Sequence, residues 1–157
     1  MSKMAINPAD IILSHKGSIK INGIELAELS KIEIKASPEK KTIGIMNSAT
    51  KGEITTSYTG TIDLELSKVY SRFKPTLLEC AKKLEPFNFS LECTTYNPKG
   101  NGEEDLTIEN CWMNGDILLA QLNAEGDFLK ETYQAGFEIE SAYFDDMLDD
   151  GETWNSL

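Results

Sequence analysis

The stretch Gly52-Glu-Ile-Thr-Thr-Ser-Tyr-Thr-Gly-Thr-Ile-Asp-Leu-Glu-Leu66 decides the fold class of this chain. From Tyr58 to Ser67, apolar or small side chains alternate with polar ones at every step. A period of two places successive side chains on opposite faces of a β-strand. We therefore predict a strand with one face in the core and one polar, acidic face in water.

The pattern changes to helical spacing immediately after this strand. Apolar residues recur at intervals of three and four over residues 69–84, which predicts one amphipathic helix at about residues 71–85. Ser71 is the expected N-cap, and Pro75 falls in the first turn, where its missing N–H is tolerated. Pro86 ends the helix. Alternation resumes over residues 87–94, so the central unit is strand, helix, strand.

Further strands are predicted before this unit. Asn22-Gly23 separates two short alternating segments and predicts a tight hairpin with a type I′ turn, because both turn positions need a positive φ. Residues 30–36 alternate again and predict another half-buried strand. Residues 37–51 lose the alternation and are expected to form a long connecting loop.

The strand pattern continues after the unit. Residues 106–113 predict a strand, and Asn114-Gly115 is a second hairpin signal that leads into the apolar run 117–122, expected as a strand covered on both faces. Residues 129–140 alternate as a long strand, in which Glu131 is the one charge on the apolar side. The sequence therefore predicts a mainly β fold with one helix. Its strand edges must be closed, covered or paired with another chain.

Length and composition indicate a single domain over residues 1–157, with an N-terminal arm at about 1–13 and an acidic C-terminal tail at about 145–157. The hydrophobic fraction of 40% suffices for a core. No apolar run approaches the roughly 20 residues of a membrane span, so no membrane anchor is expected. The net charge of −11 argues against a protein that holds nucleic-acid phosphates.

No set of residues for catalysis or metal binding stands out. A nucleophile triad needs a histidine to relay the proton. The only histidine, His15, lies in the weakly patterned N-terminal part of the chain. Cys80, Cys93 and Cys111 are widely spaced, whereas zinc sites draw on tight local ligand pairs. We therefore expect no enzyme, no metal and no cofactor, and reduced cysteines that are mostly buried.

Some apolar side chains fall outside the strand pattern and are candidates for contact with another subunit. They occur in the N-terminal arm, in the predicted loop and in the acidic tail, and such side chains need a partner surface in their own subunit or another. The alternatives are a frayed terminus and a disordered loop. The candidates are Ile11, Ile12, Ile43, Ile45, Met46, Met147, Leu148 and Trp154.

Several short motifs follow one another in order along nearly the whole chain. They are the hairpin Asn22-Gly23-Ile24-Glu25-Leu26-Ala27, the segment with Ile45-Met46, Thr59-Gly60-Thr61 leading into residues 68–73, Pro86-Phe87-Asn88-Phe89 after the helix, and Phe144-Asp145-Asp146. This ordered set resembles the tail tube proteins of contractile-tailed phages. The resemblance is to the version carried by defective prophages and by phage-tail-like, R-type bacteriocins.

The resemblance implies a β-sandwich or β-barrel with one flanking helix. It also implies hexameric rings that stack into a hollow tube inside a contractile sheath, with baseplate and tape-measure proteins as further partners. The particle would be assembled in the cytoplasm of the host bacterium, as part of a virion tail or a phage-tail-like particle. In a phage, DNA would pass through the lumen without specific binding. Type VI secretion tubes use the same fold, so a tube of that kind is an alternative.

Two polar strand faces are candidates for the wall of such a lumen. The wall is expected to be net acidic, since like charge prevents the phosphate contacts that would hold DNA. Alternatively, these two polar faces meet outer solvent or the sheath. The candidate residues are Thr59, Thr61, Asp63 and Glu65 on one strand and Gln134, Glu138 and Glu140 on the other.

A competing hypothesis from another functional class is a monomeric β-barrel that binds a small ligand. Such a module needs an apolar interior pocket with a few convergent polar groups. No cluster of aromatic residues in the sequence marks such a pocket.

Overall fold

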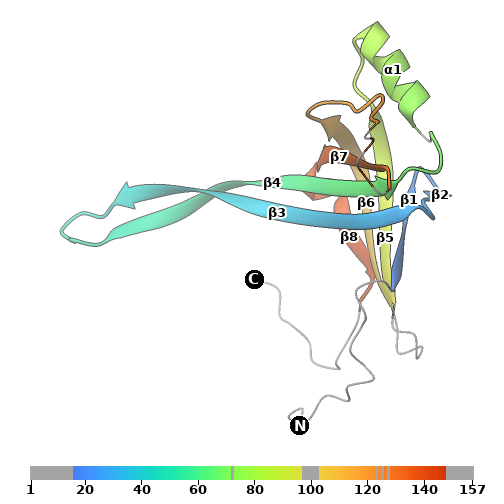
Figure 1. Ribbon diagram of the computed structural model, residues 1–157. Coiled ribbons are helices and arrows are strands. Elements are labelled where there is room, and N and C mark those ends of the chain that lie inside the picture. Colours follow the sequence, from blue (N-terminus) through green and yellow to red (C-terminus); the bar gives the residue numbers. More distant parts are fainter. Residues whose placement is uncertain are drawn as a thin grey trace, which may run out of the picture.

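The structure is a computed structural model that describes residues 16–71, 73–96, 103–122, 124, 126 and 128–147. Within these residues the chain is mostly β-strand, with one α-helix that stands at one end of the sheet (Figure 1). The elements are β1 (Gly17–Ile21), β2 (Ile24–Glu25), β3 (Leu29–Gly44), β4 (Lys51–Ser67), α1 (Lys74–Lys83), β5 (Asn88–Tyr96), β6 (Glu103–Asn114), β7 (Lys130–Phe137), the 3₁₀ helix η2 (Ile139–Ser141) and β8 (Ala142–Asp146). The predicted mainly β fold with one flanking helix is confirmed.

The strands form a single antiparallel sheet in the order β2-β1-β5-β6-β7-β4-β3. Strand β6 changes partner along its length, because β8 pairs with its first part at residues 105–108 and β7 with its last part at 111–114. The described helices all lack the length and apolar character needed to cross a membrane.

The core is built mainly from apolar side chains of β1, β4, β5, β6 and β7, and α1 stands at one end of the sheet and contributes one apolar side chain to it. The alternation predicted for β4 is confirmed at Ile62, Leu64 and Leu66, which are buried, but Tyr58 at its start is 55% exposed. Leu77 of α1 is fully buried in the same cluster. The ring of Phe73, just before the helix, meets Tyr133 of β7 edge to face at a centroid distance of 4.9 Å.

The prediction of a long loop at residues 37–51 is wrong, because β3 and β4 continue through most of this segment as paired strands. The ladder extends to Gly44 opposite Lys51, which leaves a short turn between them. Pro38 is tolerated because β3 is an edge strand whose partner in the sheet is β4. Pairing of β4 with β7 stops at Gly60. Residues 37–59 therefore leave the sheet as a two-stranded hairpin, here called the arm (Figure 1).

The predicted N-cap of the helix is also corrected. Helix α1 begins after Phe73, which makes no side-chain capping bond. Ser71 instead accepts the Lys74 N–H through its backbone carbonyl at 3.0 Å, in a turn that precedes the helix. Pro75 lies in the first turn as predicted, and Leu84 closes the helix in a left-handed conformation.

Of the two predicted hairpins, one is confirmed and the other is wrong. Asn22 and Gly23 both have positive φ, at 53° and 82°, and join β1 to β2. At Asn114-Gly115 the glycine alone has a positive φ, and residues 117–122 form no strand. The partner of β6 at this edge is β7, which occupies the position expected for that run. Leu122 is 92% exposed, so the run is not covered on both faces.

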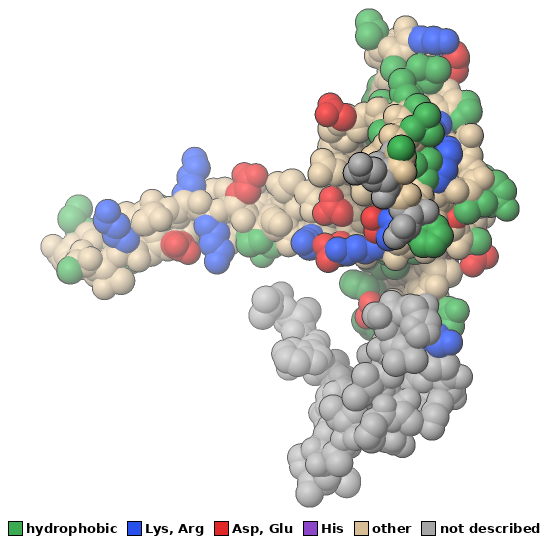
Figure 2. Space-filling model, in the orientation of Figure 1, with side chains coloured by type: hydrophobic (Ala, Val, Ile, Leu, Met, Phe, Trp, Pro, Cys, Tyr) green, Lys and Arg blue, Asp and Glu red, His purple; other side chains and the backbone are tan. Residues whose placement is uncertain are grey.

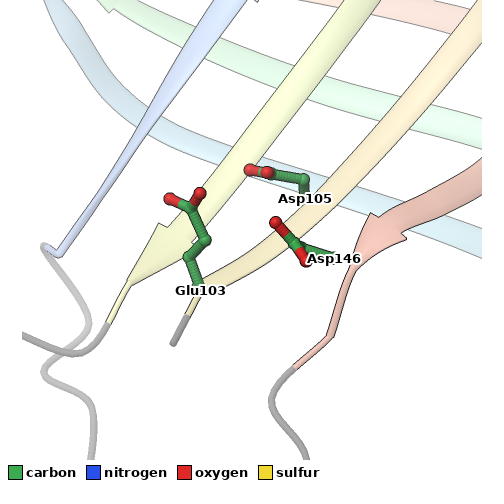
Figure 3. A group of neighbouring side chains, drawn as sticks. All are labelled: Glu103, Asp105 and Asp146. Atoms are coloured by element: carbon green, nitrogen blue, oxygen red, sulfur yellow. The ribbon is translucent and has the colours of Figure 1, made fainter. Parts of the chain in front are cut away.

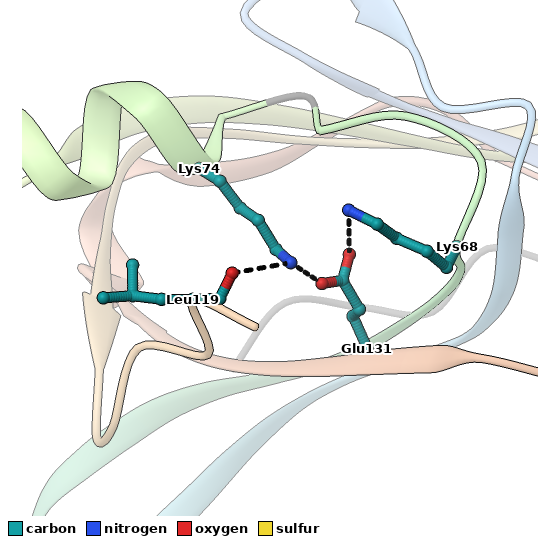
Figure 4. Close-up of polar contacts among 4 residues, drawn as sticks. All are labelled: Lys68, Lys74, Leu119 and Glu131. Carbon is teal, nitrogen blue, oxygen red and sulfur yellow. Dashed lines mark hydrogen bonds and ion pairs between the residues drawn. The ribbon is translucent and has the colours of Figure 1, made fainter. Parts of the chain in front are cut away.

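The charge on the apolar side of β7 is explained by a buried ion cluster (Figure 4). Glu131 is 3% exposed and pairs with Lys74 at the start of α1 and with Lys68 after β4, the latter at 3.7 Å. Lys74 Nζ also donates a hydrogen bond of 3.2 Å to the carbonyl of Leu119. One carboxylate thus joins β7 to the end of β4, the start of α1 and the segment 115–122.

Removing this carboxylate is expected to destabilise the fold strongly. In Glu131→Ala two lysines lose their counterion, one of them buried, and the free energy of unfolding should fall by about 3–5 kcal/mol. The measurement is denaturant unfolding followed by circular dichroism. The matched control Glu140→Ala removes an exposed carboxylate from η2 and should change stability by less than about 0.5 kcal/mol. Equal effects of the two substitutions would contradict the structural role of the cluster.

Candidate functional site

The arm contains a β-bulge that reorganises its two faces. The register shifts between Glu39 opposite Ser57 and Lys40 opposite Thr55, which inserts Thr56 as an extra residue. Glu39 fixes this bulge with three hydrogen bonds: its carbonyl accepts from Thr56, and its carboxylate accepts from Ser57 and Thr59. Because of the insertion, β4 residues beyond the bulge lie on the face opposite to the one they would otherwise occupy.

The bulge gathers apolar side chains at the end of the arm. Ile43 lies opposite Gly52, and Ile54 lies on the same face opposite Lys41. A Cβ atom on Gly52 would stand 3.3 Å from Ile45 Cδ1, so Ile45 packs over the glycine. These three isoleucines are 41–48% exposed and Met46 is 87% exposed.

We call Ile43, Ile45, Met46 and Ile54 the arm tip. Three of its members are predicted from the sequence as contact residues, and the structure brings them together. Ile54 was missed, although its apolar side chain within a polar stretch is a usable signal.

The remaining predicted contact residues are only partly described by the structure. Met147 follows β8 directly and is 67% exposed. Ile11, Ile12, Leu148 and Trp154 lie outside the described residues, as do the N-terminal arm at 1–13 and most of the acidic tail. Asp145 and Asp146, where the tail was expected to begin, belong to β8.

The two predicted polar faces meet at one residue of the second, Gln134. Asp63 of β4 lies directly opposite Gln134 of β7, and Thr61 lies opposite Gly136 on the same face. Strand β3 extends this face on the other side, with Glu33 opposite Asp63. We call it the polar face and define it by β3, β4 and β7 residues. They are Lys31, Glu33, Lys35, Thr61, Asp63, Glu65, Thr132 and Gln134.

The polar face also contains two lysines from β3, which were not predicted from the sequence to lie there. Lys35 and Lys31 both pair with Glu33, at 3.2 and 3.8 Å. The hydrogen bond from Lys35, helped by the charge of Lys31, holds the pKa of Glu33 below its ordinary value. A cleft of about 560 Å³ on this face is lined by Lys31 and Glu33 together with Asp63, Glu65 and Asp116.

Three of the predicted lumen residues lie apart from this surface. Thr59 belongs to the arm, where it binds Glu39. Glu138 follows β7 and accepts a 2.8 Å hydrogen bond from the Asn110 side chain, while Glu140 lies in η2. Both follow the point where β7 stops pairing with β4, so they are not part of the ladder that forms the polar face.

A group of three carboxylates lies where β6 begins and β8 ends (Figure 3). Glu103, Asp105 and Asp146 each present an oxygen within 4.8 Å of the others. Asp105 also accepts a 2.6 Å hydrogen bond from the Thr94 hydroxyl. Exposed acidic groups commonly gather in this way without a metal, and no second feature of the described residues points to a bound ion here.

The cysteines offer no reactive thiol at the core. Burial raises the pKa of Cys111 to about 12, so its thiol stays protonated at neutral pH. Cys80 and Cys93 are half-buried, and all three are free. Desolvation, with the nearby charges of Glu104 and Asp105, also raises the pKa of Cys93.

An apolar cleft of about 360 Å³ beneath α1 is the place to test the small-ligand hypothesis. It is lined by Ile21, Ile24, Leu26, Phe73 and Phe87, with polar groups from Asn22 and Thr76. The Asn22 side-chain oxygen already accepts a 2.9 Å hydrogen bond from the Ser90 N–H. Because this polar atom is committed to the fold, the cleft lacks the convergent polar set of a specific ligand site.

Two proteins of Bacillus subtilis are similar in sequence to this chain. The profile of a family described as "Phage tail tube protein" matches residues 4–141. The phage-like element PBSX protein XkdM of Bacillus subtilis is 26% identical over 137 residues, covering 86% of this chain and 92% of that protein. YqbM from the same organism matches with the same identity and coverage.

Solved structures of similar fold belong to contractile injection systems. The cap that terminates the tube of the anti-feeding prophage superimposes with a TM-score of 0.63 at 8% identity, covering 91% of this chain and 95% of that one. A chain of the extended sheath–tube complex of PVC, an extracellular contractile injection system, gives a TM-score of 0.58 at 8% identity, covering 87% and 93%. At this level of identity the likeness shows the fold.

The family match covers most of the chain, and the family consists of structural proteins, so the prediction that this chain is not an enzyme is confirmed. The chain is therefore a component of a phage tail or phage-tail-like particle, and it belongs to the phage tail tube protein family.

Proposed function

We propose that the chain forms hexameric rings that stack into the inner tube of a contractile phage tail or a phage-tail-like bacteriocin. The tube would assemble in the cytoplasm of the host bacterium, inside a contractile sheath and joined to baseplate and tape-measure proteins. The observation that carries this proposal is the arm, a long hairpin that leaves the sheet with an exposed apolar end.

The arm has the properties of a segment that is stabilised by another subunit. An isolated two-stranded hairpin is marginally stable in water, and residues 37–59 pair only with each other in the described ladders. Burying one isoleucine side chain contributes about 1.5–3 kcal/mol. That gain is repeated at every subunit of a tube, which suits an assembly protein.

The open edges of the sheet support the same proposal. In the described ladders β3 pairs with β4 alone and β8 pairs with β6 alone. Long unpaired edges are templates for pairing with another chain, and closing the strands of several subunits into a ring removes them.

The polar face is the surface that suits the lumen. It lies on the face of β4 opposite the buried side chains, so a ring that places this face at the axis places the core outside. Its lysines Lys31 and Lys35 are paired with Glu33. Among the described residues, no lysine forms an ion pair with Asp63, Glu65 or Asp116, so these carboxylates leave the face acidic. An acidic wall would let DNA slide without sticking.

Replacing the predicted tip residues tests the contact. The variant Ile43→Ser/Ile45→Ser/Met46→Ser should keep the β-rich circular dichroism of the wild type but form no tubes in negative-stain micrographs, because the arm loses its apolar contact. The control Val69→Ser/Leu122→Ser changes exposed apolar side chains elsewhere and should still form tubes. Loss of the fold in the triple variant would instead place the tip in the subunit's own core.

Reversing charge on the polar face tests its place in the lumen. Asp63→Lys/Glu65→Lys should still assemble, but its tubes should retain short duplex DNA at low salt and protect it from nuclease. In a DNA-carrying particle the same change should slow or trap the genome. The control Glu79→Lys/Glu85→Lys, at α1, should bind DNA in a nuclease-sensitive way. Nuclease-sensitive DNA on both variants would place the polar face against outer solvent or the sheath.

A further inference from the structure

The outer arm, by which we mean residues 40–54, has a charge opposite to that of the chain as a whole. The chain holds 26 acidic residues against 15 lysines and arginines. Residues 40–54, by contrast, carry Lys40, Lys41 and Lys51 against the single acid Glu53, and all four are exposed. Figure 2 shows these basic side chains spaced along the arm, with hydrophobic atoms at its end. The arm therefore offers an apolar tip surrounded by positive charge.

A matching apolar surface lies at the open edge of the sheet, on β8. A row of side chains crosses four strands in register, from Ile19 to Cys93, Leu106 and Phe144. Ile19 is fully buried, whereas Phe144 at the edge is 52% exposed. The adjacent residue, Tyr143, points to the opposite face of the strand, where its hydroxyl donates a hydrogen bond to Glu109. The row thus stops at an uncovered end, where a further apolar side chain would extend it.

The charge around this edge is uniformly negative. Strands β5, β6 and β8 hold seven acidic residues and no lysine or arginine. Glu103 begins β6 and Asp146 ends β8, and their carboxylates lie close to that of Asp105. Surfaces of opposite sign steer association and fix its register.

A second apolar surface among the described residues, the cleft beneath α1, fits the tip less well. This cleft has no carboxylate among its lining residues, so the arm lysines would find no counterion there. The arm tip cannot reach the β8 edge of its own chain, since Figure 1 shows the arm extending away from β8. The occupant of the edge is therefore a second copy of the chain.

We infer that the arm tip of one copy docks on the β8 edge of a second copy. Ile43, Ile45 and Ile54 lie against Phe144, and the arm lysines lie beside Glu103 and Asp146. This contact rests on the proposed tube function and names the surface that receives the arm. It is directional, because each copy offers one arm and one edge.

A charge-swap experiment tests the contact. Lys40→Glu/Lys41→Glu and Glu103→Lys/Asp146→Lys should each raise the protein concentration needed for half-maximal tube formation by about tenfold or more, because each puts like charges together. The chain that carries all four substitutions should assemble near the wild-type concentration. The control Glu79→Lys/Glu85→Lys changes the net charge equally at a distant site and should leave Lys40→Glu/Lys41→Glu unrescued. Light scattering and sedimentation measure assembly, and circular dichroism checks folding.

The outcomes separate the contact from the function it rests on. Rescue by the matched substitutions and not by the control supports the contact. Assembly of the wild type without rescue overturns the contact and leaves the tube function standing. A wild type that stays monomeric at every salt and protein concentration overturns the tube function and the contact together.

A cross-link gives a second measurement that does not depend on reversing charge. Tubes of Ile54→Cys/Phe144→Cys treated with a short bismaleimide should give a ladder of linked chains, above the background of the wild type with its native cysteines. The pair Ile54→Cys/Leu122→Cys should give only that background. Equal ladders from both pairs would overturn the assignment of β8 as the receiving edge.

Discussion

The pairing of β4 with β7 on one side and β3 on the other is the constraint on which the rest of this structure depends. Its register sends Ile62, Leu64 and Leu66 into the core and Asp63 and Glu65 to the polar face. The pairing ends where Gly60 meets Phe137, and a Cβ on Gly60 would stand 2.7 Å from that ring. A glycine is therefore required at the point where the arm leaves the sheet.

The buried Glu131 holds together the elements that surround this pairing. It lies opposite Leu66 in the ladder and binds lysines from two other parts of the chain. A buried ion cluster of this kind adds little net stability over a well-packed apolar one, but losing one partner is costly. We interpret its role as positional: it fixes where α1 begins relative to β4 and β7.

Separation of charge and apolar surface gives the subunit a polarity. The acids gather on β5, β6 and β8, whereas the outer arm carries lysines around an apolar tip. A contact between two different surfaces on identical chains is heterologous, and it produces rings or open stacks in place of closed pairs. A tube requires both, so the distribution of side chains agrees with the family to which the chain belongs.

The sequence by itself determined the strands with one buried face, the helix, the Asn22-Gly23 hairpin and the family, because each is written in local periodicity or in an ordered set of motifs. It concealed the arm, since a hairpin outside the sheet has no buried face and therefore no alternation, and residues 37–51 looked like a loop. It also placed a strand at 117–122, where apolar composition without a pairing partner gives none. Only the tertiary structure supplied the lysines that neutralise Glu131, placed Gln134 beside Asp63 and set β3 lysines on the same face. Those features arise from pairing between segments distant in the chain, and local pattern carries no record of which strands become neighbours.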